Sequence, residues 1–564
     1  MSVVVLVPAP KSAARHPSRM TRAPNSPLPK QHLYGAAGLA VLVGLYLLVG
    51  LTGHVPWRGD DARHFGPIFE MLQGNGLLFP LIAGEPSTSF PPLYYWTGSV
   101  FALLFGWLLP PHDAARLATT LYTALAIFWI ARASARLYGK HTRTPAALLT
   151  LGTLGLVLHA HETQPMIAVM SFVAMTLAGL SLIPTRPALG SLQAAAGSVL
   201  AFLAGGLPGV MLTLPLFLVV VIACPECRNP RASGGLILGL SLAVGAGALW
   251  PLVLHYQAPE LLALWWRREW LEFGADPLRR DEFSRLVELF GWFAWPLWPI
   301  ALWSLWRARR QLMRISWLLP IASALLAGGW IIANGSLAQA TMLPLIPPLA
   351  LLAAAGIPTL RRGAANAFDW FAVMTFVVFA LLVWIAWTAQ AVSWPPGLAR
   401  HVARVAPGFE LKGSVSQALA GLGICVSWIV LMWRLPRSFN RGPASWAMGM
   451  TTLWCLAVVL LMPWFDYDRS YRPVATSLAI ALAGERSDCV AMLELSPSQR
   501  ASFHYFAGVR PERVSGNETV CSFLLVYDSR NPAALRPAQE WQQIWEYRRG
   551  GGKQLETFRL YRRD

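Results

Sequence analysis

The stretch that decides the fold is HVPWRGDDARHFGPIFEMLQGNG, residues 54–76, which follows the first long apolar segment. It sets Asp60 beside Asp61, with Arg63 and His64 directly after them. The 564-residue chain is 55% apolar and only 13% charged, with a mean hydropathy of +0.46. Soluble proteins carry about 25% charged residues. The sequence therefore predicts a membrane protein that places two carboxylates just outside its first span.

The basic residues of the chain report its orientation. The formal net charge is +18, and the excess falls mostly in short loops between apolar segments. Such loops are typical of cytoplasmic turns and do not indicate nucleic-acid binding. The basic N-terminal tail, 1–32, is expected to be disordered and cytoplasmic. The apolar segment from about 33 to 53 is long enough to span and begins too late for a signal peptide. Asp60 and Asp61 then emerge on the external side.

The number of spans follows from the basic loops, if all of them are cytoplasmic. The domain 33–463 then contains about thirteen transmembrane helices. The segment 92–110, inside the external loop 54–112, is also apolar, but a crossing there would move every later loop to the wrong side. We interpret it as a helix in the membrane interface, and place the second span at 113–131. The basic loops are 132–145, 184–190, 225–231, 306–314, 360–367 and 434–441.

The C-terminal region, 464–564, differs in character from the rest. It alternates short apolar runs with polar turns and shows one helical pattern near 497–507, which predicts a small α/β domain on the external side. Cys489 and Cys521 each open a predicted strand, and form either a disulfide or two buried thiols. The CPEC stretch, 224–227, has metal-ligand spacing but no second pair, which argues against a zinc site.

A family resemblance runs through nearly the whole chain. The stretch GDDARHFGPIFEMLQGNGLLFPLIAGEPSTSFPPLYYWTGSVFALLFG, 59–106, resembles the first external loop of the GT-C glycosyltransferases, especially bacterial lipid A aminoarabinose transferases and protein O-mannosyltransferases. Their Asp-Glu-x-Arg-Tyr block corresponds to residues 60–64, and their Lys-Pro-Pro-Leu-x-Tyr-Trp block to residues 90–96. Weaker similarities are AFLAGGLPG at 201–209, MLPLIPPLALLAA at 342–354 and PWFDYDRSYRPVA at 463–475.

The resemblance implies a fold and an activity. The fold is an all-α polytopic GT-C membrane domain with interfacial helices in the first external loop, plus the small C-terminal domain. The activity is inverting transfer of a sugar from a polyprenyl-phosphate donor to a lipid, glycan or protein acceptor, at the periplasmic face of a bacterial inner membrane. Such a reaction needs a base for the attacking hydroxyl and cations for the departing phosphate. By its place in the motif, Asp60 is the expected base.

The remaining site assignments also follow the resemblance. The second acidic position of the family falls near Gln164, and Glu162 is assigned that role. The family lysines are replaced by Phe90 and Gly205, which points to a different donor or phosphate-binding mode. No cofactor is required, although a divalent metal held by His161, Glu162 and Asp60 is a weaker interpretation. The expected substrate-binding residues are Asp61, Arg63, His161, Tyr94, Tyr95, Arg267 and Arg268.

Other interpretations stay open on sequence grounds. Asp60 and Asp61 could simply favour the start of a helix, and His161 and Glu162 could form an ordinary loop. A transporter or flippase would carry ionisable residues within its spans, whereas here they gather in external loops, which favours chemistry at the interface. A non-catalytic envelope scaffold, an inactive relative and a polysaccharide ligase or polymerase are the further alternatives.

Overall fold

The computed structural model describes residues 30–274, 278–335, 337–409, 411, 413–483, 489–513, 521–528, 541–550 and 555–563. The tail 1–32, expected to be disordered, lies almost wholly outside the described residues. The chain divides into a short unit, Met1–Leu42, and a larger unit, Val43–Asp564. Of the short unit the structure describes the first part of helix α1 (Lys30–Leu48). All that follows concerns the larger unit.

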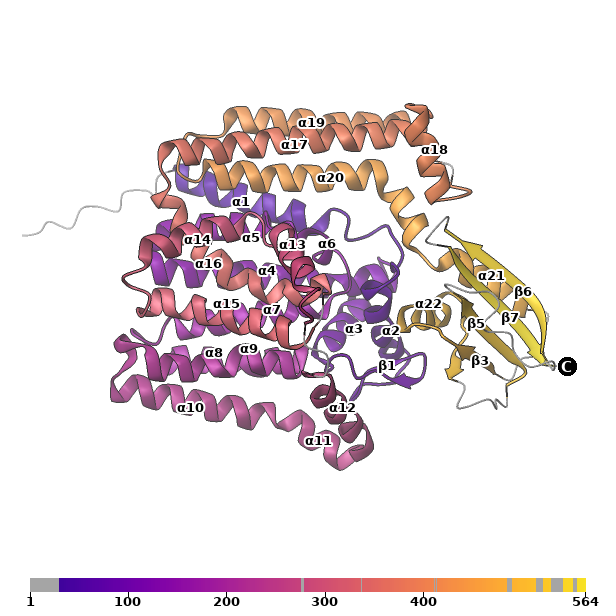
Figure 1. Cartoon of the computed structure of the whole chain (residues 1–564), viewed down its shortest axis with the longest axis horizontal. Coiled ribbons are helices and arrows are strands. Elements are labelled where there is room, and N and C mark those ends of the chain that lie inside the picture. Colours follow the sequence, from indigo (N-terminus) through magenta and orange to yellow (C-terminus); the bar gives the residue numbers. More distant parts are fainter. Residues whose placement is uncertain are drawn as a thin grey trace, which may run out of the picture. The chain divides into compact units, whose positions relative to one another are not determined.

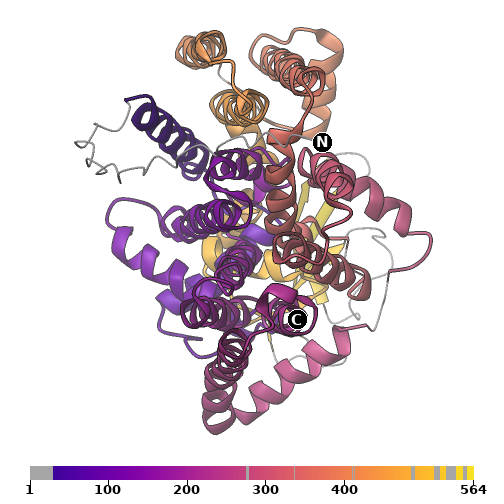
Figure 2. The ribbon, with the colours of Figure 1, turned by 90° about the vertical axis from the view of Figure 1, so that its left-hand side faces the viewer.

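Most of the larger unit is helical, which confirms the predicted all-α membrane fold class. Many of its long helices run side by side (Figure 1), and a view turned by 90° shows several of them nearly end-on (Figure 2). Eight described helices are long and apolar enough to cross a membrane. They are α4 (Pro111–Tyr138), α8 (Pro187–Gly205), α10–α11 (Pro230–Gln257), α15 (Ile315–Ala333), η3–α16–η4 (Gln339–Thr359), α17 (Arg362–Ala391), α19 (Val415–Arg434) and α20 (Arg441–Arg469).

Shorter apolar helices complete the helical part. A pair bent by 92°, α13 (Phe283–Phe293) and α14 (Leu297–Ala308), makes a ninth span if it counts as one. Nearly every residue of α7 is buried, so that helix lies inside the protein. The predicted number of about thirteen spans stays a prediction. The shorter apolar helices of the larger unit are α3 (Leu93–Phe105), α7 (Pro165–Leu180), α9 (Leu207–Ala223) and α21 (Arg472–Leu482).

The segment 92–110 forms a short helix rather than a long one. Helix α3 has 13 residues, so it is about 20 Å long against a hydrocarbon core of about 30 Å. The chain leaves α3 at Gly106 and enters α4 at Pro111, a residue that suits the first turn of a helix. The second span predicted at 113–131 therefore falls inside α4. The placement of α3 in the membrane interface stays a prediction.

The first external loop contains helix α2 (Asp60–Leu72) and a small antiparallel hairpin. Gly59 precedes α2 with a φ of 96°, a conformation that glycine adopts without strain. Asp60 and Asp61 occupy the first turn, where the helix dipole favours carboxylates. The interpretation that the two carboxylates favour the start of a helix is therefore correct in part: both lie in the first turn, although no side chain caps the helix. The hairpin strands are β1 (Leu81–Ile82) and β2 (Glu85–Pro86).

Among its described residues, the C-terminal domain contains a five-stranded sheet and helices α21 and α22, which confirms the small α/β domain predicted from the sequence. The strand order is β4-β3-β5-β7-β6, with β4, β3 and β5 parallel and the last two strands antiparallel. Helix α22 (Pro497–Ala507) begins with a capping box between Ser496 and Gln499. The predicted domain boundary at 463–464 stays a prediction, and α20 continues across it. The strands are β3 (Val490–Leu493), β4 (Pro511–Arg513), β5 (Phe523–Asp528), β6 (Trp541–Arg549) and β7 (Glu556–Arg563).

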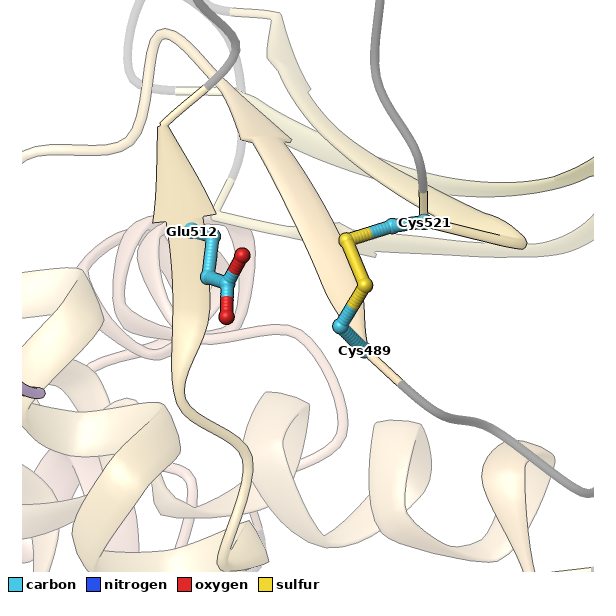
Figure 3. A group of neighbouring side chains, drawn as sticks. All are labelled: Cys489, Glu512 and Cys521. Atoms are coloured by element: carbon cyan, nitrogen blue, oxygen red, sulfur yellow. A yellow bond between two sulfur atoms is a disulfide. The ribbon is translucent and has the colours of Figure 1, made fainter.

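Cys489 and Cys521 form a disulfide (Figure 3), which confirms the first of the two sequence alternatives. Cys489 directly precedes β3 and Cys521 lies two residues before the start of β5, and these two strands are parallel neighbours. Because parallel neighbours begin at the same edge of a sheet, the two residues are close together. Cys224 and Cys227 are free thiols with their sulfur atoms 3.1 Å apart.

Candidate active site

A cavity of about 220 Å³ lies where the first external loop meets the ends of α7, α9 and α15. Helix α2 contributes Asp60, Arg63 and His64 to its lining, and α12 (Pro259–Glu272) contributes Arg268 and Glu269. Segments that are more than 200 residues apart in sequence therefore place two carboxylates and two guanidinium groups around one cavity. The sequence predicts the first of these segments as part of an external loop, and the structure brings the two together.

Asp60 is the carboxylate of the cavity that is most suited to act as a base. Its side chain is 37% exposed, although α2 itself is mostly buried. The amide Nε2 of Gln164 donates a hydrogen bond of 3.1 Å to Asp60 Oδ2. His64 Nε2 lies 4.0 Å from Asp60 Oδ1. The hydrogen bond from Gln164 thus orients the carboxylate, which remains open to the cavity, as a general base requires.

His64 links Asp60 to the interior of the loop. Its Nδ1 lies 3.0 Å from the hydroxyl of Tyr95, and the ring of Phe90 packs against it edge-on with centroids 5.2 Å apart. Burial lowers the pKa of His64 to about 4, against the opposing effect of Asp60, so the ring is neutral at pH 7. A hydroxyl of Tyr95 that donates to Nδ1 leaves the ring proton on Nε2, toward Asp60.

Two arginines are fixed at the cavity by consecutive hydroxyl side chains. Arg63 Nη2 donates a hydrogen bond of 2.6 Å to Ser89 Oγ, and Arg268 Nη1 donates one of 2.5 Å to Thr88 Oγ1. Guanidinium groups held in this way suit the recognition of phosphate. They supply positive charge next to Phe90, the position at which the family resemblance implies a lysine. The adjacent Arg267 is exposed and does not line the cavity.

Asp61 lies outside the cavity lining, in a buried network. It is 1% exposed, and Arg116 Nη2 lies 2.8 Å from its Oδ2. The backbone N–H groups of Trp57 and Thr163 donate to its two oxygens. Burial alone would raise the pKa of Asp61, but the Arg116 guanidinium more than offsets this effect and holds that pKa below its usual range. Asp61 therefore fastens α2 to α4 and to the loop before α7.

His161 and Glu162 of that loop are also buried, and neither lines the cavity. The ring nitrogens of His161 lie 2.5 and 2.6 Å from the backbone carbonyl oxygens of Val157 and Tyr46. Glu162 Oε2 lies 3.6 Å from His159 Nδ1. Burial raises the pKa of the Glu162 carboxyl, and its contact with His159 opposes that rise.

The two tyrosines expected to bind substrate are fully buried. The hydroxyl of Tyr94 lies 2.6 Å from Thr119 Oγ1 and accepts a hydrogen bond from the backbone N–H of Gln164. Tyr95 contacts His64 as described above. Both side chains are 0% exposed. They contact two residues that do face the cavity, Gln164 and His64, and hold them in place.

The described residues offer no convincing metal centre. The one group of three or more potential ligands found among them is Cys489, Glu512 and Cys521 (Figure 3), and its two sulfur atoms are bonded to each other. Asp60, His161 and Glu162, the ligands considered from the sequence, do not form such a group. The ring nitrogens of His161 face carbonyl oxygens instead.

Sequence reasoning missed several lining residues, namely His64, Thr88, Ser89, Gln164 and Glu269. His64 and Gln164 had a signal, since both fall within or next to family motifs. Glu269 follows Arg268 directly, and its Oε2 accepts the backbone N–H of Leu207 at the start of α9. Thr88 and Ser89 carried no signal, because short hydroxyl side chains in a loop have many ordinary roles.

The chain has the fold of ArnT from Cupriavidus metallidurans. The structure of that protein bound to undecaprenyl phosphate matches with a TM-score of 0.66 and 17% identity, over 93% of this chain and 98% of that one. Its apo structure matches with a TM-score of 0.65. The protein thus has the fold of ArnT, and its apolar helices are those of a multi-pass membrane protein, as the resemblance read from its first external loop implies.

The curated relatives carry one name, undecaprenyl phosphate-alpha-4-amino-4-deoxy-L-arabinose arabinosyl transferase. The protein from Pectobacterium carotovorum is 26% identical over 368 residues, which is 61% of this chain and 64% of the relative. The protein from Edwardsiella ictaluri is 34% identical over 97 residues, 17% of each chain. These matches span less than two thirds of the relatives' length. No family model matches the chain.

Proposed function

We propose that this protein is an inverting glycosyltransferase that moves a sugar from a polyprenyl-phosphate donor to a lipid, glycan or protein acceptor at the periplasmic face of the inner membrane. The observation that carries the proposal is the partly exposed carboxylate of Asp60 in a cavity that also holds Arg63 and Arg268. The ArnT fold and the names of the curated relatives support the same reaction class.

The reaction can be written with these groups. The donor phosphate binds between Arg63 and Arg268, and the acceptor hydroxyl lies against Asp60. Asp60 takes the hydroxyl proton while the acceptor oxygen attacks the anomeric carbon from the side opposite the phosphate. The bond from that carbon to the phosphate oxygen breaks, and its electron pair leaves with polyprenyl phosphate, whose charge the two arginines stabilise. Attack from the opposite side inverts the anomeric configuration.

Glu162 is the second candidate for the acid–base role. It lies in the loop that also carries Gln164, and its raised pKa, caused chiefly by burial, is a property found in many catalytic carboxyls. Its burial against His159 places it behind the cavity rather than in it. The two carboxyls are therefore compared directly in the experiment.

The experiment uses the purified protein in lipid, a set of polyprenyl-phosphate sugars and an envelope lipid extract, and measures the release of free polyprenyl phosphate. We expect Asp60→Asn to abolish release while the protein stays folded. Glu162→Gln tests the second carboxyl. Asp281→Asn is the matched control, because the side chain of Asp281 is 74% exposed and lies outside the cavity.

Each outcome decides between named alternatives. Loss of release in Asp60→Asn but not in the control supports the transferase and its base. Release that persists in Asp60→Asn and is lost in Glu162→Gln moves the base to Glu162. A wild-type protein that releases nothing from any donor contradicts the proposal and favours a transporter, a flippase or a scaffold.

A further inference from the structure

The C-terminal domain packs directly on the helix that carries Asp60. In Figure 1, α22 lies beside α2 at one end of the long helices. The rings of Phe65 and Phe69, both on α2, pack edge-on against Tyr505 of α22 with centroids 4.9 and 5.0 Å apart. Gly66 lies so close that a Cβ atom there would be 2.9 Å from the Cβ of Ala501. The two helices therefore cross at their smallest side chains.

The contacts with α22 lie on the side of α2 that faces away from the cavity. Successive residues of a helix are rotated by about 100°. Phe65, Gly66 and Phe69 therefore project roughly opposite to Asp60 and His64. Helix α2 is held between the cavity on one side and the C-terminal domain on the other.

A buried carboxylate, Glu70, joins the last turn of α2 to the C-terminal domain. The side chain is 0% exposed, and its Oε1 accepts the backbone N–H of Gly84 at 2.7 Å. His504 Nδ1 lies 3.4 Å from Oε1, and Arg510 Nη2 lies 3.6 Å from Oε2. Arg510 Nε also donates to His504 Nε2 at 3.0 Å, which leaves the ring proton on Nδ1, facing Glu70.

A second pair fastens the hairpin of the first external loop to α22. Arg500 Nη1 lies 2.8 Å from Glu85 Oε2, and Arg500 Nη2 donates a hydrogen bond of 2.9 Å to the carbonyl of Ile82. The arginine side chain is only 3% exposed. Both the hairpin and α2 are thus tied to the same helix of the C-terminal domain.

We propose that the C-terminal domain positions the transfer site: α22 holds α2, and with it Asp60, at the cavity, and Gly66 and Glu70 are positioning residues. The first turn of α2 is fixed to the membrane domain by Asp61 and Arg116, and His64 contacts Tyr95 of α3. The other side and the last turn of the helix pack on α22. This inference rests on the proposed function for its effect on turnover. Its structural half is tested without any substrate.

The test is a double-mutant cycle at the two small residues that are in contact, Gly66 and Ala501. Gly66→Ala inserts a methyl group against Ala501, Ala501→Gly removes the opposing one, and the double variant has room again. Gly397→Ala is the matched control, because nothing lies within 4 Å of a Cβ at that position. The measurements are kcat and KM for the polyprenyl-phosphate sugar, and hydrogen exchange of the α2 backbone over residues 60–72.

We expect Gly66→Ala to speed exchange of α2 and to lower kcat about tenfold with little change in KM, because a shift of the base away from the reacting atoms impairs turnover more than binding. Alanine favours helix more than glycine, so faster exchange reports lost packing rather than a weaker helix. The double variant should recover both quantities, and Gly397→Ala should change neither. Glu70→Gln, which keeps an acceptor for Gly84 but loses the charge, should act in the same direction.

Two results would overturn the proposal. Unchanged exchange of α2 in both Gly66→Ala and Glu70→Gln shows that α22 does not hold the helix. Faster exchange of α2 with unchanged kcat shows that the contact between α22 and α2 does not affect turnover. An inactive wild-type protein contradicts the proposed function and with it the positioning role, whereas the exchange cycle still decides whether α22 holds α2.

Discussion

Asp61 and Arg116 form a buried ion pair, with Oδ2 and Nη2 2.8 Å apart and side chains that are 1% and 0% exposed. The preceding residue, Asp60, is 37% exposed at the cavity. Two adjacent carboxylates of one motif thus have different surroundings. The first faces the cavity, and the second fastens the helix that carries it.

This difference predicts that two conservative substitutions affect different properties of the protein, its stability in one case and transfer in the other. Asp61→Asn leaves Arg116 with one carboxylate partner, Asp113, which also lies 2.8 Å away, and should lower the free energy of unfolding by about 2–3 kcal/mol, less than the cost of a buried charge with no partner. Asp60→Asn removes a partly exposed carboxylate and should change stability by about 0.5 kcal/mol or less, although we expect it to abolish transfer. Thermal unfolding of both variants in the same detergent measures the difference. Equal melting temperatures would contradict the assignment of Asp61.

The same pair predicts a pH dependence of stability. The pKa of Asp61 in the folded protein lies below its usual range, because the Arg116 guanidinium more than offsets the effect of burial. A carboxyl with a lowered folded pKa stabilises the protein above its unfolded pKa of about 3.9, and loses that contribution as the pH falls further. The stability difference between wild type and Asp61→Asn should therefore be constant from neutral pH to about pH 5 and shrink below about pH 4. A difference that shrinks already near pH 6 would assign the effect to another group.

Gln164 provides a test of the base. Gln164→Glu places a second carboxylate where an amide now donates to Asp60, and it keeps an oxygen for the N–H of Met166. Like charges at this distance favour protonation of one of the two groups. The acid limb of the pH profile of kcat/KM should therefore move to higher pH. Gln164→Met, similar in size but uncharged, should lower the rate without this displacement.

The adjacent arginines of α12 should differ in their effect on the donor. Arg268 lines the cavity and is held by Thr88, so Arg268→Gln should raise KM for the donor about tenfold to a hundredfold, as expected for lost hydrogen bonds to a charged group. Arg267 is exposed and outside the lining, so we expect Arg267→Gln to have a much smaller effect. Steady-state kinetics of the two variants measures this directly. Equal increases in KM would support the sequence prediction that both arginines bind substrate.

The disulfide of the C-terminal domain predicts a stability change. The Cys489→Ser, Cys521→Ser double variant should lower the free energy of unfolding by about 2–4 kcal/mol, because the unfolded chain regains conformational freedom. Cys425→Ser, which changes a free cysteine, should have a small effect. Denaturant unfolding followed by tryptophan fluorescence compares them. A wild-type protein whose stability does not respond to reductant would contradict the structural role of the bond.

The sequence was informative wherever the deciding pattern is local. The second span, which falls inside α4, and the helix at Pro497–Ala507 follow from patterns a few residues long. The disulfide is one of two alternatives that the positions of Cys489 and Cys521 left open. The pairing of Asp61 with Arg116 joins residues 55 positions apart, and no periodicity connects them. The sequence also does not show which of two neighbouring residues with similar side chains faces the cavity. Arg267 and Arg268 differ only by the rotation of one helical residue, and Glu162 and Gln164 lie in an irregular loop whose backbone decides which of them reaches Asp60.

The contact between Arg500 and the carbonyl of Ile82 joins residues separated by 418 positions. Because a chain is made from its N-terminus, the loop with Asp60 is complete long before α22 exists. During that interval α2 has its contacts with the membrane domain, through Asp61 and Arg116 and through His64 and Tyr95, but not those with α22. The first external loop therefore acquires its full set of contacts late in synthesis, once the C-terminal domain has folded against it. In a partly made chain, Asp60 would already have its contact with Gln164, while the side of α2 that packs on α22 was still uncovered.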